Sequence, residues 1–189
     1  MCIRDSGNAP ISTATIPPLE ILEAAYPVRF THWGLRTDSG GAGKHRGDLG
    51  AEYEIELLAD DADLFFFGER GHSAPPGVCG GQAAARNEFY YQQGEEMHRP
   101  PLVSKLRGAH IKKGDRIKIC SPGGGGYGSA LDREIEKIEQ DLHLGYISPQ
   151  IAQESYGICF DDDGEVNHLA TESKRTLLKT QVSKDETYE

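Results

Sequence analysis

The sequence is poor in basic residues. It carries 20 Lys and Arg against 30 Asp and Glu, which gives a formal net charge of −10. Proteins that bind a phosphate backbone concentrate Lys and Arg on one surface, because the phosphates must be neutralised. The longest concentrated apolar run, Leu64–Phe67, is far shorter than the roughly 20 residues that cross a bilayer. We therefore expect neither nucleic acid nor a membrane as a partner.

Paired cysteines are also missing. The chain has four widely spaced cysteines, namely Cys2, Cys79, Cys120 and Cys159. None forms a Cys-x-x-Cys pair, and the first residues show no secretory pattern. These features predict reduced thiols and a cytoplasmic location.

Motifs that would bind a metal are absent as well. The seven histidines never recur at i, i+2 or i, i+4, and no His-Glu-x-x-His occurs. The segment Asp161–Gly164 superficially resembles a calcium loop. That register would place Cys159 at the first ligand position and Ala170 at the last, and neither suits Ca²⁺. The sequence predicts no metal site, and a hairpin turn over Asp161–Gly164.

What the chain has in quantity is glycine: 23 residues, with 10 prolines beside them. This composition favours a loop-rich globule built on strands. Alternation of apolar and acidic residues over Glu52–Leu58 predicts a strand with one wet face. The segment Leu64–Phe67 is apolar on both faces and predicts a central strand. Further strands are expected over residues 28–35, 87–91 and 116–120. Together they predict an antiparallel β core.

The pattern changes after Gly128. Apolar residues at helical spacing, from Leu131 to Leu142, predict a helix. Ser148 followed by Pro149 predicts the start of a second helix, and Gly157 its end. A last helix is expected around residues 170–178. The fold class is therefore α+β. We expect a poorly structured or artefactual start (1–15), a β-rich body (16–130), a helical C-terminal region (131–180) and a flexible tail (181–189).

The first glycine-rich motif runs from Arg36 to Gly47. Arginine forks and glycine amides in one loop can hold an anionic or phosphorylated ligand. The alternative is that Asp38 and Ser39 cap the turn and that the cations pair with it. The candidate ligand residues of this loop are Arg36, Asp38, Ser39 and Arg46. Arg70 and His72 lie in a second polar loop, rich in Gly and Pro, and are candidates of the same kind.

The second motif, Ser121–Gly128, contains Gly-x-Gly-x-x-Gly between an expected strand and an expected helix. Nucleotide binding is one interpretation. No apolar parallel strand with an acidic residue at its end follows, which favours a structural hinge where strand backbones crowd together. The glycines with a structural or binding role are Gly123, Gly124, Gly125, Gly126 and Gly128. No Gly-x-Ser-x-Gly motif or catalytic triad is found, so no catalytic residue is predicted.

Five motifs in this order resemble the C-terminal part of hydantoinase B/oxoprolinase proteins, such as N-methylhydantoinase B-type subunits. They are Pro27-Val-Arg29, Leu35–Gly47, Gly77-x-x-Gly-Gly81, Pro122–Gly128 and Gly145-x-Ile-Ser-Pro-x-x-Ala152 with Tyr156-Gly157. The resemblance covers residues 16–178. Family members are considerably longer, so the sequence is expected to be a fragment that is inactive alone.

The resemblance implies a hydrolase that opens a cyclic amide, a hydantoin or 5-oxoproline, with ATP used by an A-type partner subunit in a hetero-oligomer. It implies that phosphorylation activates the amide and that the B-type part hydrolyses the intermediate, with a divalent metal held by the N-terminal part. Arg36, Arg46 or the loop amides could then stabilise a phosphorylated species. Two alternatives stay open: a subunit of an ATP-dependent acetone or acetophenone carboxylase, and a non-catalytic scaffold or interface.

Overall fold

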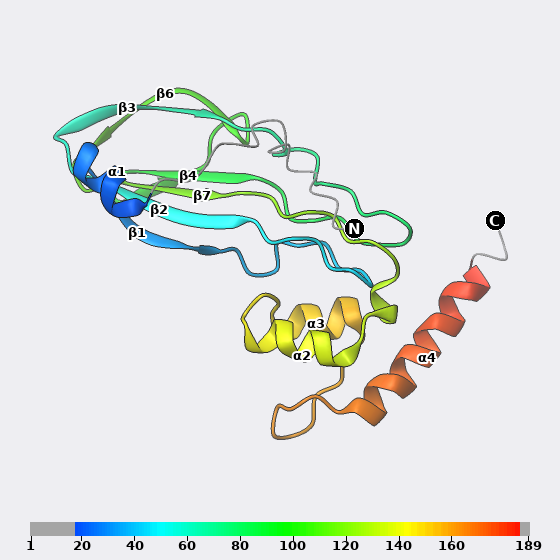
Figure 1. The fold of residues 1–189 in the computed structure, drawn as a ribbon. Helices are drawn as coiled ribbons and strands as arrows, with labels where there is room; N and C mark the ends of the chain where they lie inside the picture. The colour runs from blue at the N-terminus through cyan, green and yellow to red at the C-terminus, as the bar shows by residue number, and fades with distance from the viewer. Residues whose placement is uncertain (1–17, 186–189) are drawn as a thin grey trace.

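The structure is a computed structural model that describes residues 18–185, with side chains to residue 181. The expected poorly structured start, residues 1–15, lies outside the described residues. The described chain combines two antiparallel sheets with four α-helices (Figure 1). This confirms the α+β class predicted from the sequence.

The larger sheet has five antiparallel strands in the order β1-β2-β7-β4-β5. After helix α1 (Leu19–Ala25), its strands are β1 (Val28–Leu35), β2 (Ala51–Leu57), β4 (Glu88–Gln93), β5 (Glu96–His98) and β7 (Arg116–Cys120). The alternation seen in the sequence sets the register of β2, because successive side chains of a strand point to opposite faces. Its glutamates lie on one face and its apolar side chains on the other.

The smaller sheet pairs β3 (Asp61–Phe67) with β6 (Lys105–Lys112) and covers the apolar face of the larger one (Figure 1). The core between the two sheets consists of Leu57, Phe66, Phe89, Tyr91 and Ile111. The strand predicted at Leu64–Phe67 is confirmed as part of β3, but the expected position at the centre of a sheet or sandwich was wrong. Phe66 packs into the core, whereas Phe67 is 86% exposed on the opposite face of β3. Within the described residues β3 pairs with β6 alone.

The C-terminal helices form a second core. The helical elements are a 3₁₀ turn η2 (Ala130–Asp132), α2 (Ile135–His143), α3 (Pro149–Tyr156) and α4 (His168–Asp185). The predicted start and end of α3 are confirmed: the Ser148 Oγ accepts a hydrogen bond from the Ile151 amide at 3.2 Å, and Gly157 has φ 68°. Ile138, Ala152 and Tyr156 lie fully buried between α2 and α3.

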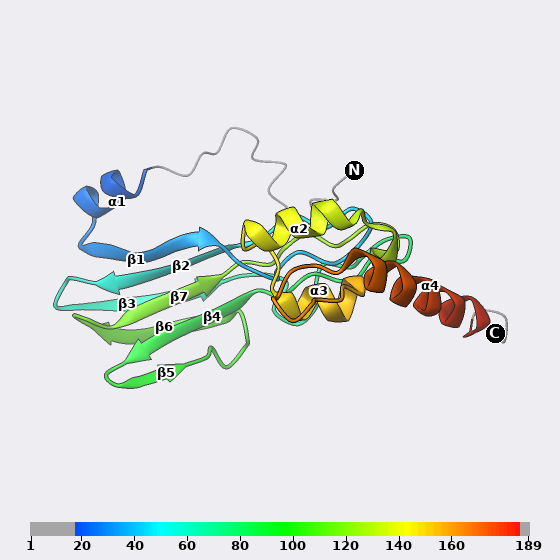
Figure 2. The ribbon, with the colours of Figure 1, turned by 90° about the horizontal axis from the view of Figure 1, so that it is seen from below.

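Helix α4 projects from the rest of the molecule (Figures 1 and 2). It extends through Asp185, further than the expected helix of residues 170–178 and beyond the expected boundary at 180. Thr171 and Arg175 attach its first turns: Thr171 Oγ1 accepts from the Cys159 amide, and Arg175 donates to the Tyr156 carbonyl at the end of α3. A cation at that position stabilises the carboxyl end of a helix.

Three glycine-rich segments connect the two cores. We call residues 40–50, 75–85 and 122–128 together the glycine layer. The segments bind each other through the backbone, for example Gly41 N to Gly124 O at 2.9 Å and Gly126 N to Gln82 O at 3.0 Å. A Cβ on Gly47 would lie 1.8 Å from the Gly124 carbonyl oxygen. Here glycine is required by close approach, because any side chain would overlap the neighbouring backbone.

Candidate functional site

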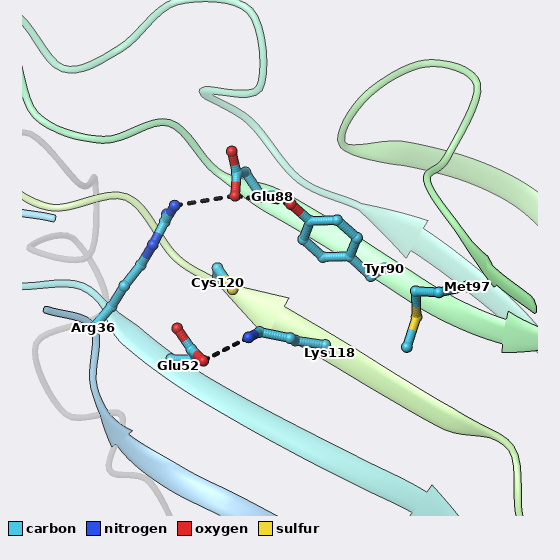
Figure 3. Close-up of a pocket in the computed structure, with 7 residues that line it drawn as sticks. All are labelled: Arg36, Glu52, Glu88, Tyr90, Met97, Lys118 and Cys120. Atoms are coloured by element: carbon cyan, nitrogen blue, oxygen red, sulfur yellow. Dashed lines mark hydrogen bonds and ion pairs between the residues drawn. The ribbon is translucent and has the colours of Figure 1, made fainter. Parts of the chain in front are cut away.

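A pocket opens on the polar face of the five-stranded sheet (Figure 3). Its volume is about 250 Å³. Four strands and the residue that follows β1 supply its lining, which consists of Arg36, Glu52, Glu88, Tyr90, Met97, Lys118 and Cys120. Most of these side chains are charged or polar, and they converge on one concave place, which is the usual form of a ligand site.

Strand register explains why these residues meet. Cys120 on β7 pairs in register with Glu52 on β2 and with Glu88 on β4. Lys118 lies two residues before Cys120, so it shares the same face of the sheet, and it pairs with Tyr90. The pocket therefore brings together side chains from neighbouring strands that are distant in the sequence.

Two ion pairs lie in the pocket. The Lys118 ammonium contacts Glu52 Oε1 at 2.7 Å, and the Arg36 guanidinium contacts Glu88 Oε2 at 3.1 Å. The Tyr90 hydroxyl donates to the same Glu88 oxygen. The hydrogen bond from Lys118 lowers the pKa of Glu52, and the bond to Glu52 raises the pKa of Lys118. Both groups are thereby held in their charged forms.

Cys120 lies at the base of the pocket and is 3% exposed. Burial raises the pKa of its thiol, and the Glu52 charge acts in the same direction. A thiolate is the nucleophilic form of cysteine, so this environment favours an inert thiol. Cys120 therefore shapes the pocket floor and is not placed for nucleophilic chemistry.

Arg36 was a predicted ligand residue, and it is the one from the first motif that lines this pocket. Its side chain also donates to two backbone carbonyls, Arg86 O at 2.7 Å and Ser121 O at 3.3 Å. These bonds fix the guanidinium above the sheet. Two other segments of the chain, one with Arg86 and Glu88 and one with Ser121, therefore hold the Arg36 guanidinium in place.

The other predicted residues of the first motif make internal contacts. Asp38, with φ 60°, accepts a hydrogen bond from the Ser148 amide at 2.7 Å, which connects this loop to the start of α3. Ser39 is fully buried, donates to the Arg36 carbonyl and accepts from the Gly50 amide. Only the bond from Ser39 to the Arg36 carbonyl lies within the turn, so Asp38 contacts the start of α3 and does not cap its own turn. A ligand role for Asp38 and Ser39 stays a prediction.

Arg46 lies apart from Arg36, in the junction between the glycine layer and α2. Its guanidinium binds both carboxylate oxygens of Asp141, at 3.1 and 3.3 Å. Arg133 binds the same carboxylate at 2.7 Å. The three side chains are at most 13% exposed. The structure thus gives Arg46 a buried ion pair, and its contact with a phosphorylated species stays a prediction.

Arg70 and His72 line a second, larger cleft of about 630 Å³. It lies where β3 ends and β6 begins, and its other lining residues are Glu69, Gly71, Ser73, Leu102, Ser104 and Lys105. Lys105 is paired with Glu69 at 3.0 Å. The structure therefore separates the six candidates into three places: Arg36 in the pocket, Arg70 with His72 in this cleft, and the rest in internal contacts.

The predicted binding glycines form the centre of the glycine layer. Gly123, Gly124, Gly125 and Gly126 are buried, and a Cβ on Gly125 would lie 1.8 Å from the Pro76 carbonyl oxygen. Gly128 has φ 73°. All strand pairs of the described sheets are antiparallel, so the motif lacks the parallel βαβ unit of a dinucleotide fold.

Residues 18–185 show neither a metal cluster nor a membrane-spanning helix. No group of three or more His, Cys, Asp or Glu side chains in that part of the chain is arranged to hold a metal ion. Among the described helices, none has the length and hydrophobicity needed to span a bilayer.

Sequence reasoning predicted only Arg36 among the seven lining residues and missed the other six: Glu52, Glu88, Tyr90, Met97, Lys118 and Cys120. A signal for two of them was present. The alternating patterns of β2 and β7 place Glu52 and Lys118 on polar strand faces, and opposite charges in adjacent strands tend to pair. The sequence alone did not show that β2 and β7 are neighbours.

A profile of the family described as hydantoinase B/oxoprolinase matches residues 4–130. The chain belongs to the hydantoinase B/oxoprolinase family. It is 34% identical over 161 residues to the B subunit of a putative D-/L-hydantoinase from Pseudomonas sp. (strain NS671). That alignment covers 85% of this chain and 27% of the relative, so the chain spans about a quarter of the relative's length.

Two solved structures share the fold of this family member. The ATP-dependent caprolactamase from Pseudomonas jessenii is 30% identical, with a TM-score of 0.70 over 84% of this chain and 28% of that one. A nucleotide-free acetone carboxylase has a TM-score of 0.77 at 24% identity, over 93% of this chain and 27% of that one. At that identity the second match shows the fold alone. The family and architecture predicted from the motifs are confirmed.

Proposed function

We propose that this chain is the C-terminal part of a hydantoinase B-type subunit, which opens a cyclic amide by ATP-dependent hydrolysis. The observation that carries the proposal is the identity of 30% or more to two proteins named for cyclic amides, a hydantoinase and a caprolactamase. The acetone carboxylase is less similar in sequence. Because the hydantoinase relative is one subunit of a larger enzyme, the similarity also supports an A-type partner in a cytoplasmic hetero-oligomer.

The chemistry explains why two components are needed. The carbonyl of an unstrained lactam is a poor electrophile, and transfer of a phosphoryl group from ATP to its oxygen gives an intermediate that water can attack. The partner would carry out the transfer, and the polypeptide containing this chain would hydrolyse the intermediate. Ring opening of a simple lactam yields a linear molecule with an amine at one end and a carboxylate at the other.

Two sites in the described chain could contact an anionic intermediate. Arg36 lines the pocket on the sheet, and Arg70 with His72 lines the larger cleft. Arg46 is a poorer candidate than the sequence suggested, because Asp141 already binds its guanidinium. Residues 18–185 arrange no cluster of metal ligands, so we propose that the N-terminal part of the full-length subunit holds any divalent metal.

The test requires the complete B-type polypeptide together with the A-type partner from the adjacent gene. The complex is assayed for ring opening of hydantoins, 5-oxoproline and caprolactam, with and without ATP. We expect ring opening of at least one substrate that stops when ATP is withheld. A complex that assembles but opens no ring would contradict the proposal.

Carboxylation is the second candidate function, because the chain is also 26% identical, over 88% of its length, to the acetone carboxylase alpha subunit of Xanthobacter autotrophicus. The same complex is therefore incubated with ATP, labelled bicarbonate and acetone or acetophenone. Label in an acid-stable product, without ring opening, would establish carboxylation. If neither reaction occurs in a complex that assembles, the scaffold interpretation gains support.

A further inference from the structure

The pocket on the sheet face combines charges of both signs in a balanced arrangement. It holds two cations, Arg36 and Lys118, and two carboxylates, Glu52 and Glu88 (Figure 3). The formal charges of these four lining residues cancel, and Arg99, which donates to the Tyr90 hydroxyl, lies outside the lining. A site for inorganic phosphate or a nucleotide usually carries an excess of positive charge, so the balanced lining favours a ligand that carries charges of both signs.

The pocket charges still have hydrogen-bonding capacity. The ion pairs and the Tyr90 hydroxyl use Oε2 of Glu88 and Oε1 of Glu52. Each carboxylate has a second oxygen, and the Lys118 ammonium has three donors of which the Glu52 contact takes one. A ligand can therefore bind both kinds of charge without breaking either ion pair.

The cavity walls set the size and shape of such a ligand. The volume of about 250 Å³ is at the small end for a ligand pocket. Met97, which is 51% exposed, supplies an apolar wall beside the charges. A short methylene chain would contact Met97, while its charged ends contact the lysine and the glutamates.

We propose that this pocket binds a small zwitterion, one amine and one carboxylate joined by a short apolar chain. The carboxylate accepts hydrogen bonds from Lys118 and Arg36, and the ammonium donates to the second oxygens of Glu52 and Glu88. The ring-opened product of a simple lactam has this chemistry, whereas that of a hydantoin carries a neutral ureido group in place of the amine. The identification with a lactam product rests on the proposed function, and the preference for a zwitterion rests on the pocket alone.

The experiment measures binding by calorimetry to the complete B-type polypeptide in its complex. The probes are 6-aminohexanoate and, as single-charge and uncharged controls, hexylamine, hexanoate and caprolactam. Inorganic phosphate is the fifth probe. We expect 6-aminohexanoate to bind at least about tenfold more tightly than the others, because each charge-assisted hydrogen bond contributes on that scale. Equal affinities, or no binding of 6-aminohexanoate, would overturn the proposal.

The variants separate the pocket from the rest of the sheet face. Lys118→Met should weaken 6-aminohexanoate binding at least about tenfold. The matched control is Arg116→Met, since Arg116 pairs with Glu54 on the same face but does not line the pocket. An equal loss in both variants would refute the site. Met97→Trp fills the pocket without removing a charge, and it should abolish binding while the melting temperature stays unchanged.

This test and the test of the proposed function can fail separately. A complex that opens the ring with ATP but binds no 6-aminohexanoate would keep the function and overturn the pocket proposal. Zwitterion binding that depends on Lys118, in a complex without ring opening, would keep the pocket and overturn its assignment to a product.

Discussion

The sheet face and the glycine-layer junction both use arginine–carboxylate pairs, in opposite ways. On the sheet, Arg36 and Glu88 border an open pocket, and the Glu88 side chain is 35% exposed. At the junction, Asp141 holds Arg46 and Arg133 together in the interior. The same chemistry therefore serves a proposed binding surface in one region and the attachment of α2 to the loops in the other. Burial of the ion pairs distinguishes the two regions.

The largest effect is expected in the glycine layer. Gly47→Ala would force a Cβ to within 1.8 Å of the Gly124 carbonyl oxygen, so backbone segments must separate. We expect a loss of at least about 3 kcal/mol in the free energy of unfolding, measured by urea denaturation. Gly34→Ala is the control, because its new Cβ would lie 3.5 Å from the nearest atom, a side-chain atom of His32. A similar loss in both would contradict the close-packing argument.

The junction should be the next most sensitive. Asp141→Asn leaves the buried guanidinium groups of Arg46 and Arg133 without a counter-charge. Removing one partner of a buried ion pair costs about 3 kcal/mol or more. The comparison is Glu88→Gln on the sheet, for which we expect less than about 1 kcal/mol because the pair is partly exposed. Equal losses of unfolding free energy in Asp141→Asn and Glu88→Gln would contradict the expected difference between the buried and the partly exposed ion pair.

A smaller effect is expected at Ser39. Ser39→Ala leaves the Gly50 amide and the Arg36 carbonyl without their hydroxyl partner in a fully buried position. We expect about 2 kcal/mol of destabilisation in thermal or urea unfolding. Thr37→Ala removes an exposed hydroxyl bond to Gly145 and should cost less. If Ser39→Ala left stability intact but abolished turnover, Ser39 would be a ligand residue instead.

The smallest effect concerns pH and the Glu52–Lys118 pair. Because the pKa of Glu52 is lowered from its ordinary 4.5 in the folded state, its contribution is present above that value and is lost as pH falls through the folded pKa. The pKa of Lys118 is raised from 10.5, so its contribution is lost only as pH rises through the folded pKa. Lys118→Met should reduce stability by up to about 1 kcal/mol at pH 7 and by less at pH 3. A loss that is equal at both pH values would show that the pair contributes nothing electrostatic.

Local signals predicted some elements well. Helix α3 was predicted to within a residue because its cap, its first-turn proline and its terminal glycine are adjacent in the sequence. Strand β6 was missed. Its charged and small residues interrupt the alternation, and the positive φ of Gly108 lies inside the strand. It is stabilised by pairing with β3, which the sequence of β6 does not show.

The sites depended still more on distant contacts. The sequence around Arg46 does not indicate its partner, because Asp141 lies 95 residues further along the chain. Three strands, β2, β7 and β4, must pair in that order before Glu52, Lys118 and Glu88 become neighbours. The motifs correctly indicated the family, but the residue types in them did not distinguish internal contacts from a binding surface.

The glycine layer also constrains how the chain folds during synthesis. Its three segments bind each other over long sequence separations, as Gly41 to Gly124 and Gln82 to Ala42 do. Ordering such loops costs entropy before any contact forms, and contacts of high sequence separation slow folding. The first motif cannot form its backbone hydrogen bonds with the second until residue 124 has left the ribosome. In a shorter nascent chain, the glycine amides of the first motif lack these carbonyl partners. We therefore expect the β-rich body to complete its folding only after the second motif, Ser121–Gly128, has been synthesised.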